Sequence, residues 1–173
     1  RTMKIYTDVL PRQLLLDCSA QLNSMLGERV WGSSTFIWKG VNKGACGDVL
    51  VAYIPQNLAI QLNNALNKTY FPSNTKEIVY QFYMWNKLSN IDIHNDPHYS
   101  FGATIYLNSI DANCGGFFIW KDKEEKTDYI FKAICPKQNM MVVNEAAELH
   151  TVTTVSPYIA TPRFSIQIWG LQN

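Results

Sequence analysis

The sequence predicts an α+β fold that is mainly β, with two helices preceding a run of short strands. Apolar residues recur at helical spacing in the first half. From Lys76 onward, short runs of β-branched and aromatic residues alternate with Gly, Asn, Asp and Pro, a pattern typical of a sandwich or barrel-like β fold. No repeat or linker divides the 173 residues, so we expect one domain. Residues 1–75 would supply supporting helices and strands, and residues 76–173 the β core with the site.

Both expected helices have one apolar face and no residues that suggest chemistry. Pro11 suits the first turn of a helix, and Gly27 predicts its end. The inner face of this helix would consist of Leu14, Leu15, Cys18, Leu22, Met25 and Leu26. A second helix is expected after Pro55, with an inner face of Leu58, Leu62, Ala65 and Leu66. We therefore expect the two helices to buttress a sheet.

The expected strands are short and concentrated in the second half. In the first half we expect one at Ile5–Leu10 and one at Thr35–Lys39, the latter within a loop-rich stretch at 32–47. In the second half we expect eight, at Ile78–Asn86, Ile91–Asn95, Gly102–Leu107, Gly116–Trp120, Tyr129–Ala133, Met140–Asn144, His150–Val155 and Arg163–Trp169.

Composition excludes several classes of protein. Hydrophobic residues make up 47% of the chain, which is too apolar for a disordered segment. The net charge of +1 comes without a basic stripe, so no nucleic-acid partner is expected. No apolar run approaches the roughly 20 residues that cross a bilayer, and the first residues do not resemble a signal peptide. The four cysteines form no CxxC pair and suit free thiols, so we expect a soluble, cytoplasmic protein without a membrane partner.

Two of the three histidines form a candidate metal site with one aspartate. His94 and Asp96 are two residues apart, so on a strand their side chains project from the same face. His150 lies at the start of another expected strand. Two imidazoles and one carboxylate on a β scaffold match the facial triad that binds Fe(II) and leaves coordination positions open.

Other interpretations of these histidines are available from the residues alone. His94 and His150 would, in the simplest case, be half-buried histidines hydrogen-bonded to their neighbours. Alternatively, His94, Asp96 and His98 would form a contiguous cluster for a metal such as zinc. Pro97 disfavours that cluster, because proline interrupts the strand that would align the three side chains. We expect His98 at the rim of a pocket instead.

An ordered set of motifs surrounds these residues. Residues 103–108 read ATIYLN, residues 115–120 read GGFFIW, and Pro136 precedes residues 142–144, VVN. His150 begins HTV, and residues 163–169 read RFSIQIW. In this order the set resembles the Fe(II)- and 2-oxoglutarate-dependent dioxygenases, and most closely their prolyl-hydroxylase-like branch. The resemblance extends from about Val79 to Trp169, half of the chain.

The resemblance implies a fold, cofactors and an activity. The fold would be a double-stranded β-helix, the jelly-roll or cupin-like core. The cofactors would be Fe(II), 2-oxoglutarate as co-substrate and O2, with ascorbate in support. Such enzymes convert 2-oxoglutarate and O2 to succinate and CO2 while hydroxylating a C–H bond, here of prolyl residues in a peptide or protein, or of a small molecule. Asp96 favours hydroxylation, since related halogenases carry a small residue in its place.

The resemblance also implies residues for 2-oxoglutarate. Arg163 matches the basic residue that pairs with the far carboxylate of the co-substrate, and a buried carboxylate needs such a partner. Ser165 would add a hydroxyl from the same face of the strand. Tyr106 matches a tyrosine that hydrogen-bonds this carboxylate, and Thr104 shares its face. The alternative roles are a structural ion-pair partner for Arg163 and a core aromatic ring for Tyr106.

The substrate side departs from the family pattern. Many prolyl-hydroxylase-like enzymes have a tyrosine three residues before the first ligand histidine, where this chain has Ile91. The residues expected to line the substrate pocket are Tyr83, Trp85, His98, Trp120 and Trp169. Of these, Tyr83, Trp85 and Trp120 could equally fill the core, as could Tyr80. Two other classes stay open: a cupin-like, non-oxidative metal enzyme, and a non-catalytic jelly-roll binding domain.

Overall fold

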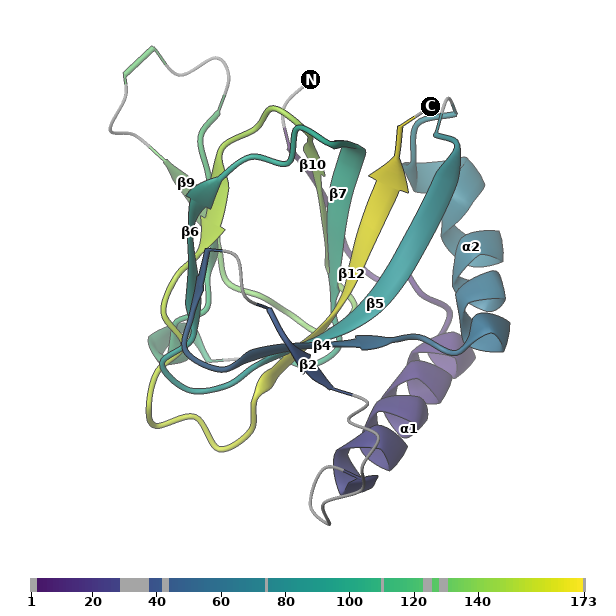
Figure 1. Cartoon of the computed structure of the whole chain (residues 1–173), viewed down its shortest axis with the longest axis horizontal. Helices are drawn as coiled ribbons and strands as arrows, with labels where there is room; N and C mark the ends of the chain where they lie inside the picture. Colours follow the sequence, from purple (N-terminus) through teal and green to yellow (C-terminus); the bar gives the residue numbers. More distant parts are fainter. Residues whose placement is uncertain are drawn as a thin grey trace.

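The computed structural model describes residues 3–28, 38–41, 44–73, 75–109, 111–122, 126–127 and 131–172. Two antiparallel sheets face each other, and two helices lie against the outer side of the larger one (Figure 1). This arrangement is a double-stranded β-helix with supporting helices, as the sequence predicts.

The helices form where the apolar spacing places them. Helix α1 spans Arg12–Glu28 and α2 spans Gln56–Tyr70, so each begins directly after a proline. Helix α1 runs one residue past Gly27. The expected inner faces are buried in one cluster with the sheet, including Leu14 and Cys18 of α1 and Leu62 and Leu66 of α2. Packing against the sheet, rather than capping, therefore holds the helices.

The larger sheet has the strand order β1-β10-β7-β12-β5-β4-β2. Its central strands are long: β5 spans Glu77–Trp85, β7 Tyr99–Tyr106 and β12 Arg163–Leu171. The other strands are β1 (Lys4–Tyr6), β2 (Lys39–Gly40), β4 (Val49–Tyr53) and β10 (Met141–Glu145). Strand β12 lies between β5 and β7, so its inward side chains are central to the sheet.

The smaller sheet has the order β3-β6-β11-β8-β9. Its strands are β3 (Ala45–Cys46), β6 (Asn90–His94), β8 (Phe118–Trp120), β9 (Lys132–Ile134) and β11 (His150–Val152). A 3-10 turn at Ala112–Cys114 precedes β8. Strand β11 pairs with β6 so that His150 lies opposite His94, and this register brings two residues 56 positions apart into contact.

The larger sheet separates two cores. Because side chains alternate along a strand, Phe164, Ile166 and Ile168 of β12 pack against the helices. The alternate residues of the same strand, Arg163, Ser165 and Gln167, project into the space between the two sheets. That inner space holds a second apolar cluster, which includes Trp85, Tyr106, Phe118 and Val142. The polar residues of this inner face are therefore grouped beside an apolar core.

Some expectations from the sequence differ from the structure. The strand expected at Ile5–Leu10 ends at Tyr6, because Asp8 adopts a left-handed backbone conformation with φ 52°. The expected strand at Thr35–Lys39 falls mostly on undescribed residues, and that at Tyr129–Ala133 partly so. Strand β4 was not predicted. The first 75 residues supply β1, β2 and β3 at the sheet edges and β4 next to β2.

Candidate functional site

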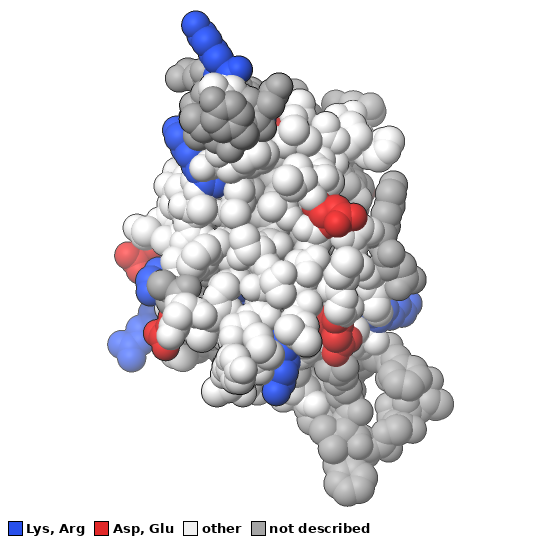
Figure 2. Space-filling view, turned by 90° about the vertical axis from the view of Figure 1, so that its left-hand side faces the viewer, with Lys and Arg blue, Asp and Glu red and all other residues white. Residues whose placement is uncertain are grey.

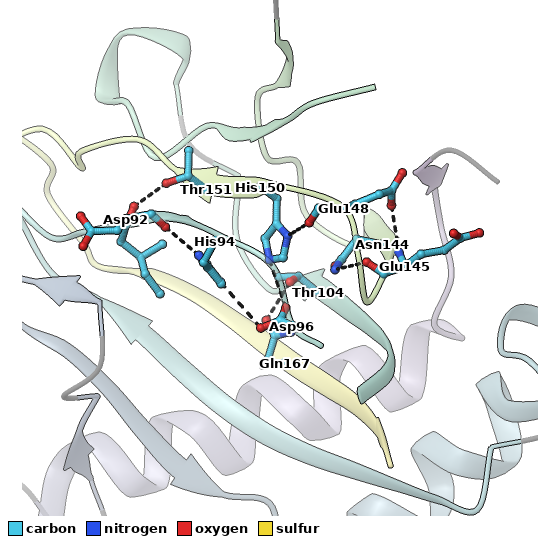
Figure 3. Close-up of polar contacts among 11 residues, drawn as sticks. Asp92, His94, Asp96, Thr104, Asn144, Glu145, Glu148, His150, Thr151 and Gln167 are labelled. Carbon is cyan, nitrogen blue, oxygen red and sulfur yellow. Dashed lines mark hydrogen bonds and ion pairs between the residues drawn. The ribbon is translucent and has the colours of Figure 1, made fainter. Parts of the chain in front are cut away.

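Three side chains from two chain segments meet at one end of the space between the sheets. Ligand atoms of His94, Asp96 and His150 all lie within 4.8 Å of one another. The Asp96 carboxylate lies 3.2 Å from His150 Nε2 and 3.9 Å from His94 Nε2. Figure 3 shows both imidazoles directed towards Asp96, from β6 and β11. Among the described residues this is the one such group, and His98 does not belong to it, so the contiguous cluster is wrong.

The backbone fixes the orientation of both imidazole rings. His94 Nδ1 lies 2.6 Å from the carbonyl oxygen of Asp92, and His150 Nδ1 lies 2.8 Å from that of Glu148. A carbonyl oxygen only accepts hydrogen bonds, so each Nδ1 carries the proton and donates it. Nε2 is then the nitrogen available to a metal, and in both rings it faces Asp96. The backbone therefore orients both rings as metal ligands.

One turn holds two of the three candidate ligands in place. The turn between β10 and β11 runs through residues 145–149. The carbonyl of Ala146 accepts the Asp96 N–H at 2.9 Å, and the carbonyl of Glu148 holds the His150 ring. The buried carboxylate of Glu148 accepts the Glu145 N–H at 2.8 Å and closes the turn (Figure 3). The position of Asp96 relative to His150 therefore depends on this turn.

A buried cation lies at the other end of the space. Arg163 is only 1% exposed, and its guanidinium lies 4.9 Å from the Trp85 ring and 5.2 Å from the Tyr106 ring. Its Nη1 donates to the Gly116 carbonyl at 2.6 Å. No carboxylate of the described chain forms an ion pair with it. Burial lowers the pKa of this guanidinium, and the nearby Tyr106 hydroxyl opposes that effect. A buried, unpaired arginine is costly unless an anion binds beside it.

Three donors at this end have no hydrogen-bond partner within the described residues. They are Arg163 Nε, the Tyr106 hydroxyl and the Ser165 hydroxyl, all fully buried. Burial raises the pKa of Tyr106 to about 12, although the Arg163 charge opposes the rise, so the phenol keeps its proton at neutral pH. Buried donors are normally satisfied, so this cluster fits a ligand carboxylate.

Gly115 and Gly116 allow the chain to approach Arg163 closely. Both adopt a left-handed conformation, with φ 69° and 68°. A Cβ at Gly115 would lie 2.2 Å from the Thr154 carbonyl oxygen, so no larger residue fits there without movement. The Gly116 carbonyl is the acceptor for Arg163. The two glycines therefore allow the backbone to come close to the Arg163 side chain.

Two cavities meet at the histidines. The inner one, of about 70 Å³, is lined by residues that include Arg163, Thr104 and His150. The outer one, of about 590 Å³, is lined by His94, Asp96 and the loop that follows β6. His94 and Trp169 line both. The candidate metal ligands therefore stand between a narrow chamber that leads to Arg163 and a wider one.

The structure places the other predicted site residues as follows. Tyr83, Trp85 and Trp169 line the inner cavity, and Tyr83, Trp169 and His98 line the outer one. Trp120 is buried in the inner core and lines neither, and Tyr80 packs on the helix side of the sheet. Burial, reinforced by Tyr99 and Asp96, raises the pKa of Tyr83 to about 12.

Two amides and one carboxylate were not predicted as site residues. They are Asn144, Gln167 and Glu148. Asn144 and Gln167 line the inner cavity. Gln167 accepts a hydrogen bond from Thr104, at 2.8 Å, so the Thr104 hydroxyl hydrogen is already used within the protein. The sequence does indicate Gln167 through its spacing. It lies two residues after Ser165 and four after Arg163, so on a strand all three side chains point to the same face.

The donor set is compatible with iron and a dicarboxylate. Two neutral imidazoles and a carboxylate are the donors of a non-haem Fe(II) site. The orphaned donors at Arg163 suit an anionic group. His94 and His150 at one end and Arg163 at the other line one cavity. The residues present therefore fit both groups.

Comparisons with solved structures reveal the same architecture. A Pseudomonas putida prolyl-4-hydroxylase aligns with 99% of this chain and 93% of its own, with TM-score 0.74 and 15% identity. A Trichoplax adhaerens prolyl hydroxylase, in complex with a hypoxia inducible factor oxygen degradation domain peptide fragment, aligns with 98% of this chain and 83% of its own, with TM-score 0.72 and 14% identity. HygX from Streptomyces hygroscopicus, with nickel, 2-oxoglutarate and hygromycin B bound, aligns with 98% of this chain and 82% of its own, with TM-score 0.65 and 9% identity.

The chain has the fold of the 2-oxoglutarate- and Fe(II)-dependent oxygenases. At these identities the likeness concerns the fold. No family model and no curated protein matches the sequence. What the site does in this chain is therefore argued from its own residues.

On the face that Figure 2 shows, basic and acidic side chains of the described residues are scattered among uncharged ones, without an area of one sign. In the described part of the chain, no helix has the length and apolar character to cross a membrane.

Proposed function

We propose that this chain is an Fe(II)- and 2-oxoglutarate-dependent dioxygenase that hydroxylates a C–H bond of prolyl residues in a peptide or protein. The observation that carries the proposal is that two features lie at opposite ends of one cavity, which His94, His150 and Arg163 line. At one end, His94, Asp96 and His150 present metal-ligand atoms. At the other, Arg163 and two hydroxyl groups present donors without partners.

The roles follow from this geometry. The two Nε2 atoms and the Asp96 carboxylate would hold the metal. Arg163, Tyr106 and Ser165 would bind the far carboxylate of 2-oxoglutarate, with a charge-assisted contact from the guanidinium and neutral contacts from the hydroxyl groups. When bound, iron with 2-oxoglutarate and O2 supplies the oxidation, in which 2-oxoglutarate and O2 become succinate and CO2 and the substrate gains a hydroxyl group.

The surroundings of the cavity support this use. Trp85 and Tyr106 pack over the guanidinium, and Phe118 stacks on the His150 ring at 5.5 Å between centroids. These rings exclude water from the charged ends and keep the ligand groups in one orientation. A non-oxidative metal enzyme would not need Arg163 and Tyr106 to converge on a dicarboxylate, and a non-catalytic domain would not need metal ligands beside this cation.

The prolyl substrate is supported by the outer cavity and by the comparisons. Tyr83 lines this cavity, and Tyr99 stacks on Trp169 at its wall, with ring centroids 4.5 Å apart. Such rings suit the apolar face of a pyrrolidine ring. Two of the similar structures are prolyl hydroxylases, and one holds a peptide.

The test measures succinate formed from 2-oxoglutarate by the protein with Fe(II), ascorbate and O2. Proline-containing peptides and small molecules are added in turn, and mass spectrometry detects the gain of one oxygen atom. We expect succinate in the wild type and none in Asp96→Ala, with hydroxylation confined to prolyl peptides. No succinate under any condition would overturn the dioxygenase. Hydroxylation of another compound alone would overturn only the prolyl substrate.

A further inference from the structure

We propose that Gln167 is a co-substrate-binding residue and that Thr104 fixes its orientation. The inference rests on the proposed function, because it assumes that 2-oxoglutarate occupies the inner cavity. It assigns an unexpected residue to the site and changes the role expected for Thr104.

The orientation of the Gln167 amide is set by a cross-strand pair. Thr104 on β7 lies directly opposite Gln167 on β12. The Thr104 hydroxyl donates to Gln167 Oε1 at 2.8 Å. The amide oxygen is thereby engaged, which leaves the two hydrogens of Nε2 as the free hydrogen-bonding capacity of the amide. Among the described residues, the Gln167 side chain makes no other hydrogen bond.

The position of Gln167 puts this nitrogen beside the path of a bound dicarboxylate. Arg163, Ser165 and Gln167 are alternate residues on one strand and project into the same inner space, at intervals of about 7 Å. The inner cavity is lined by Gln167 together with Arg163 and His150. A ligand that extends from the Arg163 end towards His150 therefore passes Gln167.

An amide at this place suits the charge of the ligand. The two carboxylates of 2-oxoglutarate meet one cation at Arg163 and the metal at the other end. A neutral N–H donor between them stabilises the anion without adding a charge. A single hydroxyl hydrogen at Thr104 cannot serve both Gln167 and the ligand. Thr104 is therefore a positioning residue that acts through Gln167.

The experiment compares 2-oxoglutarate binding in three variants, with Mn(II) in place of iron so that no turnover occurs. Gln167→Leu removes the amide. Gln81→Leu is the matched control, because Gln81 lies opposite Gln167 on β5 but does not line the inner cavity. Thr104→Val keeps the Gln167 amide but removes the hydrogen bond that orients it. Isothermal titration calorimetry measures the 2-oxoglutarate and Mn(II) affinities of each.

We expect Gln167→Leu to bind 2-oxoglutarate at least tenfold more weakly, as loss of a hydrogen bond to a charged group implies. Thr104→Val should show a smaller loss, and Gln81→Leu about none. The Mn(II) affinity without 2-oxoglutarate should be unchanged in all three, since the candidate ligands belong to β6, β11 and the loop after β6. If wild-type and Gln167→Leu proteins bind 2-oxoglutarate equally, the inference is wrong and the proposed function stands. If the wild type binds none, both are wrong.

A fourth variant separates binding from folding. Gln167→Glu has nearly the same shape and still accepts from Thr104, but it sets a carboxylate against the dicarboxylate. Its loss of 2-oxoglutarate affinity relative to the wild type should be larger at pH 8 than at pH 6, because the neighbouring dicarboxylate raises the pKa of the new carboxyl group and favours its protonation. The same ratio at both pH values would contradict a direct contact. This comparison remains decisive if Gln167→Leu fails to fold.

Discussion

Replacing Arg163 by methionine separates the two roles that a buried arginine can have. If Arg163 holds the fold together, its loss destabilises the protein. If it awaits an anion, its loss weakens ligand binding and leaves the fold largely intact. Methionine keeps an unbranched apolar chain but removes the guanidinium group and its charge.

The structure gives the size of each effect. Arg163 is 1% exposed, and its unpaired charge costs several kcal/mol of desolvation that methionine avoids. Against this, the variant loses the hydrogen bond to the Gly116 carbonyl and two cation–π contacts, at about 0.5–2 kcal/mol each. These terms oppose each other, so we expect the free energy of unfolding to change by less than about 2 kcal/mol. For 2-oxoglutarate binding we expect a loss of about 2–5 kcal/mol, roughly 30-fold to several thousand-fold.

Urea denaturation of the metal-free protein measures the first quantity, and calorimetric titration of the Mn(II)-loaded protein measures the second. Arg12→Met is the control, because Arg12 lies on the exposed start of α1 and gives the same change in net charge. A loss of more than about 4 kcal/mol in stability with unchanged 2-oxoglutarate affinity would refute the assignment of Arg163.

Three further predictions concern other residues of the candidate site. Asp96→Ala should lower the affinity for Fe(II) and Mn(II) at least tenfold without lowering the melting temperature, and normal metal binding would contradict its role. Glu148→Ala should weaken metal binding by about 10- to 100-fold, because the turn that holds His150 opens. Glu148→Gln keeps an acceptor for the Glu145 N–H, so its loss of metal affinity should be smaller. Equal losses in the two variants would mean that this hydrogen bond is unimportant. Tyr106→Phe should flatten the fall in stability of the protein above pH 10. Burial raises the pKa of Tyr106 from 10.0 to about 12, so between these pH values the folded protein keeps a proton that the unfolded chain loses. Urea midpoints measured from pH 10 to pH 12 detect the difference.

Much of the fold could be predicted because its signals are local. Pro11 and Pro55 with the apolar spacing after them place both helices within a few residues. Strand β4 was missed because its sequence, VLVAY, is apolar throughout. Val49 packs between the sheets while Leu50 and Ala52 pack under the helices, so no alternation marks the strand.

The three candidate metal ligands could be predicted because histidine is rare in this chain and two of the ligands are only two residues apart. The contacts that orient these ligands could not be predicted. The carbonyls of Asp92, Ala146 and Glu148 orient the ligands through the backbone, which any residue type provides. Trp120 was expected either to line the pocket or to fill the core, and it is buried in the inner core. The position of Trp120 depends on how the two sheets pack, which a short sequence pattern does not indicate.

The central claim is that one cavity holds a metal at His94, Asp96 and His150 and a dicarboxylate at Arg163. A crystal structure of the protein with Mn(II) and 2-oxoglutarate, with anomalous scattering to locate the metal, tests both parts together. The account predicts one metal peak between the three side chains and the far carboxylate within hydrogen-bonding distance of Arg163, Tyr106 and Ser165. A metal bound elsewhere, or a carboxylate directed away from the guanidinium, would contradict it.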